Sequence, residues 1–300
     1  MRRAGLLLGL GLALLSGCKA PEPPPPAGEP RYVVGEPYQL RGVWSYPRED
    51  FGLVDTGLAS IAADPRAGRR TANGEVHDPA GLMAAHRTLQ LPAVLVVTNL
   101  ENGRSLAVRV NDRGPADPGR VIELSRRAGE LLGIMAGRPV QVRLAVEGTL
   151  SRSLAGGLPA DEASRPVIAT APTGRVEREA LAPIAGARQA ERLREGRGPA
   201  IQAAASAAER APASVTLRED VSQGPAMPGR LFVQGSSFAS RAAAQRQAAK
   251  LGGARIEAFG PARQTEWRVR LGPFASPSEA DRALDGALRA GVSEARIIVD

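Results

Sequence analysis

The sequence predicts two small folded domains, a mainly β domain followed by an α/β domain, joined by a long linker. Residues 51–148 combine β-branched runs with glycine turns, residues 149–227 lack large apolar residues and sustained periodicity, and residues 228–300 contain an internal repeat. Periodicity and turn residues are the main local signals of strands, helices and loops. The 300-residue chain is long enough for two modest domains with linkers.

The N-terminus has the pattern of an export signal. Arg2 and Arg3 precede an apolar stretch at 4–15, which is shorter than the ~20 residues of a membrane span but typical of a signal peptide. Small residues then precede Cys18, as in a bacterial lipobox. We therefore expect residues 1–17 to be removed and Cys18 to carry lipid. Lys19, where aspartate would favour the inner membrane, favours an outer-membrane lipoprotein facing the periplasm.

Composition limits the classes of partner. Cys18 is the only cysteine, which excludes an internal disulfide, and the net charge is +8. A basic exported protein is expected to meet lipid head groups or cell-wall polymer, and not nucleic acid. Binding to any anionic surface through charge alone is an alternative, and it would be lost at moderate salt.

Residues 18–50 are predicted to be a tether and a lead-in. The segment Pro21–Pro30 is expected to form an extended polyproline spacer. The lead-in that follows contains Tyr32, Tyr38, Trp44 and Tyr46, a concentration of aromatic residues in a chain with only 3% of them. We expect these side chains to pack onto the first domain.

The β domain is predicted from its strands and turns. Residues 93–99 and 105–110 form two strand patterns separated by a Glu-Asn-Gly turn, which indicates a hairpin. A short strand at 121–124, a helix at 126–132 and a strand at 139–146 are expected after it. Ser125 is a predicted N-cap of the helix, and Gly133 is its predicted stop.

The C-terminal domain is predicted from its repeat. Residues 232–240 parallel residues 268–276, and each half continues into an alanine-rich helix and then a strand, at 254–259 and 295–299. The second helix begins with Ser276-Pro-Ser-Glu279, the pattern of a capping box. The result is a predicted βαβ–βαβ sandwich of strands and helices.

Titratable residues gather between residues 71 and 115. Glu75, Asp78, His86 and Asp112 lie near predicted strands and glycine turns. Cleavage of a glycosidic bond needs a carboxylic acid and a group that stabilises positive charge, which Glu75 and Asp112 could supply across a cleft. Spacing alone equally allows Asp112 to cap a turn and Glu75 to be solvated. His77 with His86 fits no zinc pattern, so neither a metal nor a cofactor is expected.

The first domain resembles the rare lipoprotein A family. The collinear motifs are Gly57-Leu-Ala-Ser60, Thr71-Ala-Asn-Gly-Glu75, Ala84-Ala-His86, Val97-Thr-Asn-Leu-Glu-Asn-Gly-Arg104 and Val108-Arg-Val-Asn-Asp-Arg-Gly-Pro115. The resemblance implies a double-psi β-barrel and a lytic transglycosylase that acts on peptidoglycan. It implies essential roles for Glu75, His86 and Asp112, with Asp78 as a supporting acid. We expect Asp112 to be the acid/base group, Glu75 an electrostatic or second acid/base partner, and His86 an orienting group.

The C-terminal repeat resembles a SPOR domain. The similarity rests on Phe232-Val-Gln234 and on Val269-Arg-Leu-Gly-Pro-Phe274. It implies binding to glycan strands stripped of stem peptides at the division septum, where septal proteins are candidate partners. The implied glycan-binding residues are Phe232, Gln234, Phe238, Arg268, Arg270 and Phe274. Together the resemblances predict cleavage between MurNAc and GlcNAc that leaves 1,6-anhydroMurNAc ends.

One departure from the family pattern supports an alternative function. Ile61-Ala62-Ala63 and Arg66-Ala67-Gly68 stand where the family usually has Trp-Tyr-Gly and Phe-His-Gly, and Ala116 replaces a Phe. Aromatic faces that could stack on sugar rings are therefore missing. The alternative is a septal glycan-binding lipoprotein whose barrel has weak or no activity.

Overall fold

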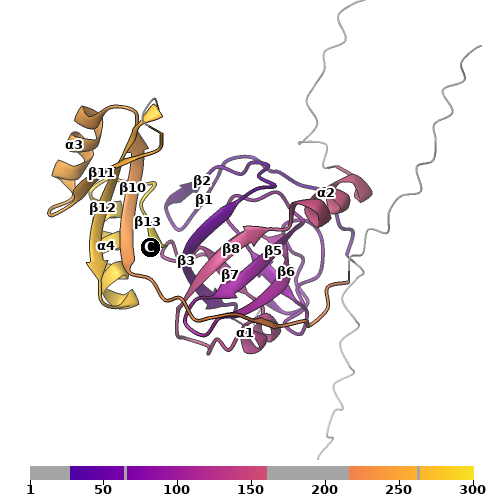
Figure 1. Cartoon of the computed structure of the whole chain (residues 1–300). Helices are drawn as coiled ribbons and strands as arrows, with labels where there is room; N and C mark the ends of the chain where they lie inside the picture. The colour runs from indigo at the N-terminus through magenta and orange to yellow at the C-terminus, as the bar shows by residue number, and fades with distance from the viewer. Residues whose placement is uncertain (1–27, 64–65, 161–215, 262–263) are drawn as a thin grey trace, which may run out of the picture.

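The computed structural model describes residues 28–63, 66–160, 216–261 and 264–300. Two folded units, a β-barrel and an α/β domain, lie next to each other (Figure 1). The predicted signal peptide, Cys18, most of the proline-rich spacer and much of the linker lie outside the described residues. None of the described helices is long and apolar enough to cross a membrane.

The first unit is a closed barrel of mixed strands. Its strands follow the order β4-β7-β3-β8-β5-β6, and pairing of β4 with β6 closes the ring. Their bounds are β3 Val54–Ile61, β4 Met83–Ala85, β5 Ala93–Asn99, β6 Arg104–Asp112, β7 Ile122–Leu124 and β8 Val140–Val146. The pairs β3–β7 and β4–β6 are parallel, whereas the others are antiparallel. The predicted double-psi β-barrel class is confirmed.

Alternating residues of the strands fill the barrel. Leu95, Val97, Leu106 and Val108 are fully or almost fully buried, as expected for strands with one face toward a core. The helix α1 (Arg126–Leu131) begins at Ser125, whose hydroxyl accepts the Ala128 N–H at 3.3 Å. The predicted cap and helix are therefore confirmed.

The barrel unit extends beyond its predicted boundary at residue 148. Helix α2 (Gly148–Gly157) packs on β5, where Ser151 Oγ accepts the Val94 N–H at 2.9 Å. Strand β9 (Ser222–Gln223), in the predicted linker, pairs with β6. Both elements are short and poor in large apolar residues, so tertiary contacts determine their structure more than local pattern does.

The lead-in packs on the barrel, as expected, but two of its aromatic residues do not. Strands β1 (Tyr38–Leu40) and β2 (Val43–Ser45) form a hairpin. The Tyr38 hydroxyl donates to the Arg87 carbonyl at 2.9 Å, and Tyr32 is buried. By contrast, Trp44 and Tyr46 are 51% and 57% exposed.

The second unit has the predicted βαββαβ order. Its elements are β10 Leu231–Phe238, α3 Arg241–Lys250, β11 Arg255–Phe259, β12 Glu266–Phe274, α4 Pro277–Arg289 and β13 Arg296–Val299. The sheet order is β11-β12-β10-β13. At α4 the Ser276 hydroxyl accepts the Glu279 N–H at 3.3 Å, but the Glu279 carboxylate bonds the Ala275 N–H instead of that of Ser276. The first hydrogen bond of the predicted capping box is therefore present, and the second goes to the N–H of the residue before the N-cap.

The edge strand β13 lies against β3 of the barrel. The Thr56 hydroxyl donates to the Val299 carbonyl at 2.7 Å and accepts the Val299 N–H at 3.2 Å. Leu58 of β3 is fully buried within the core of the α/β domain. Arg120 of the barrel binds the Asp281 carboxylate with two hydrogen bonds, at 2.7 and 3.0 Å. The barrel therefore covers the edge strand β13, whose main-chain groups would otherwise be open to pairing with another strand.

Candidate functional site

Two carboxylates lie on either side of β4. Ala85 is in register with Asp112 of β6 and with Glu123 of β7. Since neighbouring strands are about 4.8 Å apart, the two acidic residues have Cα atoms about 10 Å apart. Sequence reasoning selected Asp112 but missed Glu123. The available signal was a charged residue inside the otherwise apolar strand Ile122–Leu124.

Asp112 is held by the main chain and faces an arginine. Its Oδ1 accepts the N–H groups of Ala72, at 3.0 Å, and Arg113, at 2.8 Å. Its Oδ2 lies 3.7 Å from Arg66 Nη1. Arg66 also forms an ion pair with Glu123, so one guanidinium bridges the two carboxylates. The Asp112 side chain remains 21% exposed and therefore accessible to a ligand.

A pocket with a volume of about 10 Å³, room for about one water molecule, lies among these groups. Asp112, Glu123, Arg66 and His77 line it together with Ala62, Ala84, Ala85, Asn111 and Ser125. Burial, and then the nearby Arg66 charge, lowers the pKa of His77 below its ordinary value, so its imidazole is neutral at neutral pH. No Phe, Tyr or Trp side chain is among the lining residues. The pocket offers acidic, cationic and imidazole groups, and the His77 imidazole is the only ring among the described residues that line it.

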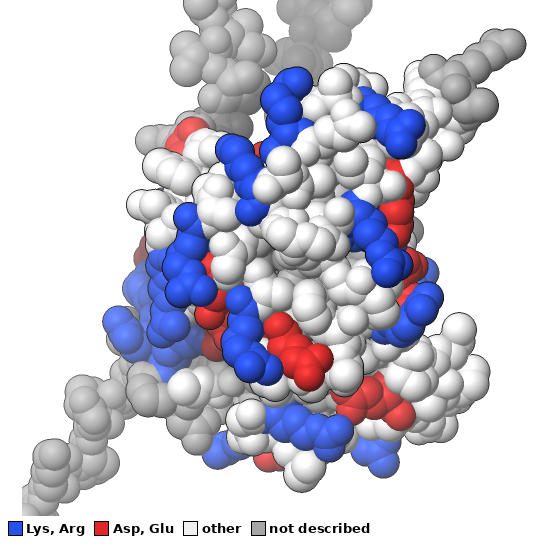
Figure 2. Space-filling model, turned by 90° about the vertical axis from the view of Figure 1, so that its left-hand side faces the viewer, with Lys and Arg blue, Asp and Glu red and all other residues white. Residues whose placement is uncertain are grey.

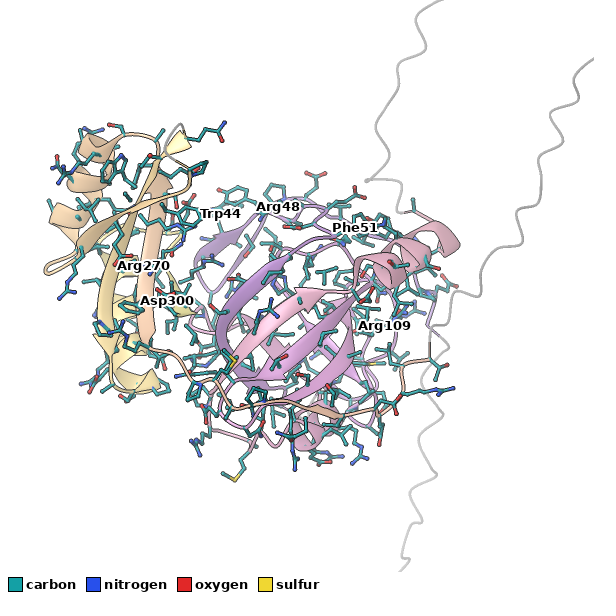
Figure 3. The ribbon with its side chains drawn as sticks, in the orientation of Figure 1. Trp44, Arg48, Phe51, Arg109, Arg270 and Asp300 are labelled. Carbon is teal, nitrogen blue, oxygen red and sulfur yellow. The ribbon has the colours of Figure 1, made fainter. Side chains whose placement is uncertain are left out.

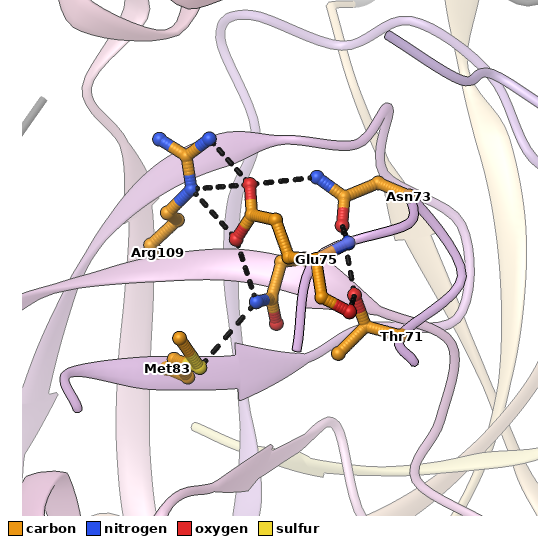
Figure 4. A network of polar contacts seen from close by, with 6 residues as sticks. Thr71, Asn73, Glu75, Met83 and Arg109 are labelled. Carbon is orange, nitrogen blue, oxygen red and sulfur yellow. Dashed lines mark hydrogen bonds and ion pairs between the residues drawn. The ribbon is translucent and has the colours of Figure 1, made fainter. Parts of the chain in front are cut away.

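Glu75 lies in a separate polar network (Figure 4). Arg109 Nε donates to both carboxylate oxygens, at 2.9 and 3.1 Å. The side-chain amides of Asn73 and Asn111 donate to the same carboxylate at 2.9 and 2.8 Å. Arg109 and Asn111 are two residues apart on β6 and both contact Glu75, whereas the register of β6 with β4 shifts between Val110 and Asp112.

This network keeps Glu75 ionised. Burial alone would raise the pKa of Glu75, but the hydrogen bonds and charge of Arg109, with the amides of Asn111 and Asn73, lower it below its ordinary value. A carboxylate of this kind is a poor proton donor at neutral pH. Glu75 and Asp112 do not meet across a cleft as proposed from the sequence. They are connected through the turn 71–75, whose Ala72 N–H binds Asp112.

His86 is neutral and has a structural environment. Its Nδ1 accepts the N–H groups of Thr88 and Leu89, both at 3.2 Å. Burial lowers its pKa to about 3, and the charges of Arg113, Arg296, Arg48 and Arg87 act in the same direction. Its main-chain N–H donates to the Asp112 carbonyl at 3.1 Å. His86 thus supports the end of β6, where Asp112 lies.

The predicted supporting acid, Asp78, makes local contacts. Its Oδ1 accepts the Ala80 N–H at 2.9 Å, which is the geometry of a turn-forming aspartate. Across the described ranges, no group of three or more His, Cys, Asp and Glu side chains is placed to hold a metal ion.

The C-terminal sheet carries a basic face. Arg255, Arg270, Gln234 and Arg296 form one row across its strands. Phe232 and Arg268 lie on the same face, and the guanidinium groups of Arg230 and Arg270 lie 5.9 and 5.6 Å from the Phe232 ring. The labelled Arg270 and Asp300 lie at this sheet (Figure 3). Figure 2 views the left-hand side of Figure 1, where the α/β domain lies, and basic side chains outnumber acidic ones on that side.

The predicted glycan-binding residues divide between the two faces of the sheet. Phe232, Gln234, Arg268 and Arg270 share the basic face. Phe238 and Phe274 pack instead against the apolar cluster under the helices. The repeat that predicted them therefore reflects core packing at these two positions.

Comparisons with known proteins match both units. The family described as lytic transglycolase matches residues 56–144, and the SPOR domain family matches residues 228–297. Endolytic peptidoglycan transglycosylase RlpA of Pseudomonas aeruginosa (strain UCBPP-PA14) is 33% identical over 275 residues, 89% of this chain and 77% of the relative. The protein of the same name from Escherichia coli (strain K12) is 30% identical, over 88% of this chain and 84% of the relative.

Two further matches cover smaller parts. RlpA of Yersinia pestis is 38% identical over 176 residues, and the match spans 49% of that relative's length. The crystal structure of the RlpA SPOR domain from Pseudomonas aeruginosa matches at 31% identity and a TM-score of 0.22, over 23% of this chain and 99% of that one.

Proposed function

The chain belongs to the RlpA family of endolytic peptidoglycan transglycosylases, and from this premise we propose that it is itself a lytic transglycosylase. Its substrate is a peptidoglycan glycan strand stripped of stem peptides. It cleaves the bond between MurNAc and GlcNAc and leaves a 1,6-anhydroMurNAc end. The observation that carries the proposal is the pocket in which Asp112, at the end of β6, and Glu123, in the middle of β7, flank Ala85.

The reaction needs one group that first gives and then takes a proton. The acid protonates the leaving oxygen of GlcNAc as the bond to the anomeric carbon of MurNAc breaks. The 6-hydroxyl of the same MurNAc attacks that carbon, and its proton returns to the carboxylate. Atoms balance without water, because the nucleophile is part of the substrate.

Asp112 is the proposed acid/base group. It is exposed to the pocket, held by main-chain N–H groups, and Arg66 is its only ion-pair partner among the described residues. Glu75 has the opposite surroundings, since its pKa is lowered by Arg109 and two amides. We therefore propose that Glu75 stabilises the turn 71–75 and contributes its negative charge to the electrostatic potential of the site. We propose that His86 supports the main chain at Asp112. Substrate entry would displace Arg66 from Asp112.

The rest of the chain determines where the enzyme acts. A signal peptide at 1–17 and lipid on Cys18 would place it in the outer membrane, facing the periplasm. The SPOR domain would bring it to peptide-free glycan at the division septum, near septal division proteins. The basic face with Phe232, Gln234, Arg268 and Arg270 suits a polymer that carries carboxylates.

The test is product analysis with purified protein. Wild type incubated with amidase-treated sacculi is expected to release 1,6-anhydro products, detected by mass spectrometry. Asp112→Asn keeps the acceptor for Ala72 and Arg113 but cannot supply the proton, so release is expected to fall at least about a hundredfold. Glu130→Gln, an exposed substitution on α1, is the matched control. Full release by Asp112→Asn would refute the assignment.

A glycan-binding protein without turnover is the second candidate. The alanine lining of the pocket and the contact between Arg66 and Asp112 favour it. It predicts that wild type binds peptide-free sacculi and yields no anhydro product. Charge alone would give binding that disappears at moderate salt.

A further inference from the structure

Two aromatic rings on the lead-in are exposed and stacked. The Trp44 and Tyr46 rings have centroids 6.5 Å apart and an interplanar angle of 25°. About half of each residue is exposed, in a chain whose aromatic content is only 3%. Neither ring is used by the core or by the pocket around Asp112.

The hairpin that carries these rings is attached to the site. Ser45, between the two aromatic residues, accepts a hydrogen bond from Arg87 Nη1 at 3.2 Å. Arg87 Nη2 donates to the Ala116 carbonyl at 3.2 Å, and the Arg87 carbonyl accepts from Tyr38. Arg87 is two residues from Ala85, or about 7 Å along an extended chain. The segment that carries the rings is therefore anchored to Arg87, two residues after the Ala85 that the carboxylates flank.

A cation accompanies the rings. Arg48 lies two residues after Tyr46, its side chain is 66% exposed, and its main-chain N–H donates to the Thr88 carbonyl at 2.8 Å. Figure 3 shows Trp44 and Arg48 on the same edge of the barrel. The Arg48 guanidinium forms an ion pair with Asp50 at 3.8 Å, so the segment combines flat apolar faces with an exposed cation that already has an acidic partner.

We propose that Trp44 and Tyr46 form a sugar-stacking subsite for the glycan strand, outside the pocket where the bond is cleaved. The chemistry is stacking of the apolar face of an amino sugar on an aromatic ring, with Arg48 exchanging its exposed contact to Asp50 for the lactyl carboxylate of a peptide-free MurNAc. The identity of the ligand rests on the proposed function. The subsite supplies the aromatic surface that the lining of the pocket lacks.

The test uses Trp44 as its own reporter. The chain has two tryptophans, so Trp267→Phe leaves Trp44 as the only one. In the full chain carrying Trp267→Phe and Asp112→Asn, soluble peptide-free GlcNAc–MurNAc oligosaccharides are expected to change Trp44 emission saturably. Adding Tyr46→Ala is expected to weaken the apparent affinity about tenfold, equivalent to about 1.4 kcal/mol. Met135→Ala, an exposed apolar side chain elsewhere on the barrel, is the control and is expected to change nothing.

Two results would overturn the subsite. One is unchanged Trp44 emission while calorimetry shows that the same oligosaccharide binds the protein. The other is an emission change with vesicles containing phosphatidylglycerol but none with the oligosaccharide, which would make the hairpin a membrane contact.

The outcome is separable from that of the proposed function, because the reporter protein carries Asp112→Asn and needs no turnover. If wild type releases anhydro product but Trp44 emission does not respond, the subsite is refuted and the enzyme proposal stands. If Trp44 emission responds but wild type releases no anhydro product, the enzyme proposal is refuted and the subsite stands. In active protein the pair Trp44→Ala and Tyr46→Ala is expected to raise KM with little change in kcat, because the contact is the same in ground and transition states.

Discussion

Glu75 and Asp112 have the same functional group in very different surroundings. Glu75 is held by Arg109 and two amides, whereas Asp112 receives main-chain N–H groups on one oxygen and faces the pocket with the other. The contrast separates an ionised structural carboxylate from the one that we propose as the acid/base group.

Glu75→Gln is expected to lower the free energy of unfolding by about 3 kcal/mol at pH 7, because Arg109 would keep a buried charge without its partner. The folded pKa of Glu75 is lowered from 4.5, so its stabilisation is present above pH 4.5 and lost as the pH falls through the folded pKa. The difference between wild type and variant should therefore shrink in acid. Urea unfolding at pH 7 and in acid measures it, and equal stability at pH 7 would contradict the network.

His86 is expected to stay neutral well below the usual imidazole range. Its folded pKa of about 3 lies below the ordinary 6.5, so its contribution is complete above pH 6.5 and is lost as the pH falls toward 3. The chain has two histidines, which makes assignment of their ring signals by NMR simple. A His86 signal that titrates near pH 6.5 would show that the ring is not buried in solution.

At the level of elements, the two halves of the C-terminal repeat differ at their helix caps. Ser276 makes the N-cap hydrogen bond of α4, whereas Ser240 makes no side-chain cap bond at α3. Ser276→Ala is therefore expected to lower the free energy of unfolding by about 1 kcal/mol, and Ser240→Ala by clearly less. Thermal unfolding of the two variants compares them directly. Equal losses would mean that the caps are equivalent.

Elements with strong local patterns were predictable, and those held by tertiary contacts were not. The strand Ala93–Asn99 and the helix after Ser125 follow from β-branched runs, a turn and a cap. Strand β4 has only three residues, Met-Ala-Ala, with no β-branched side chain, and it exists because β6 and β7 pair with it on both sides. Helix α2 and strand β9 depend in the same way on the barrel surface.

The site shows the same limit. The motifs found Asp112, Glu75 and His86, but chain spacing does not say which side chains share a face. The parallel register of β4 with β6 and its antiparallel register with β7 bring Glu123 beside Asp112, eleven positions away in sequence. Alternation along β6 instead directs Asn111 and Arg109 to Glu75. Such pairing across a closed barrel is a property of topology, which a single sequence does not display.

At the scale of the whole molecule, the C-terminal domain is docked on the barrel. Leu58 enters its core, Arg296 forms an ion pair with Asp55, and Arg120 binds Asp281. Arg296, at the end of the basic row, also contributes to the lowered pKa of His86. The basic face and the pocket around Asp112 are therefore parts of one docked assembly.

Docking predicts that the two domains stay together after the chain is cut between them. With a protease site introduced within residues 161–215, the wild-type halves are expected to co-elute on gel filtration. Asp55→Asn combined with Asp281→Asn removes two charged contacts between the domains and is expected to lower the fraction of halves that co-elute, while the pairing of β9 with β6 remains. Asp285→Asn, on an exposed position one turn further along α4, is the control. Separation of the wild-type halves would show that the contact is too weak to keep the two domains together.

The central claim is that the chain cleaves glycan without water, using Asp112. The most direct measurement is digestion of peptide-free sacculi in water labelled with heavy oxygen, followed by mass spectrometry of the new ends. The account predicts 1,6-anhydro ends that contain no heavy oxygen, and their loss in Asp112→Asn. Heavy oxygen at new reducing ends would identify a hydrolase, and no new ends at all would identify a binding protein; either result would contradict it.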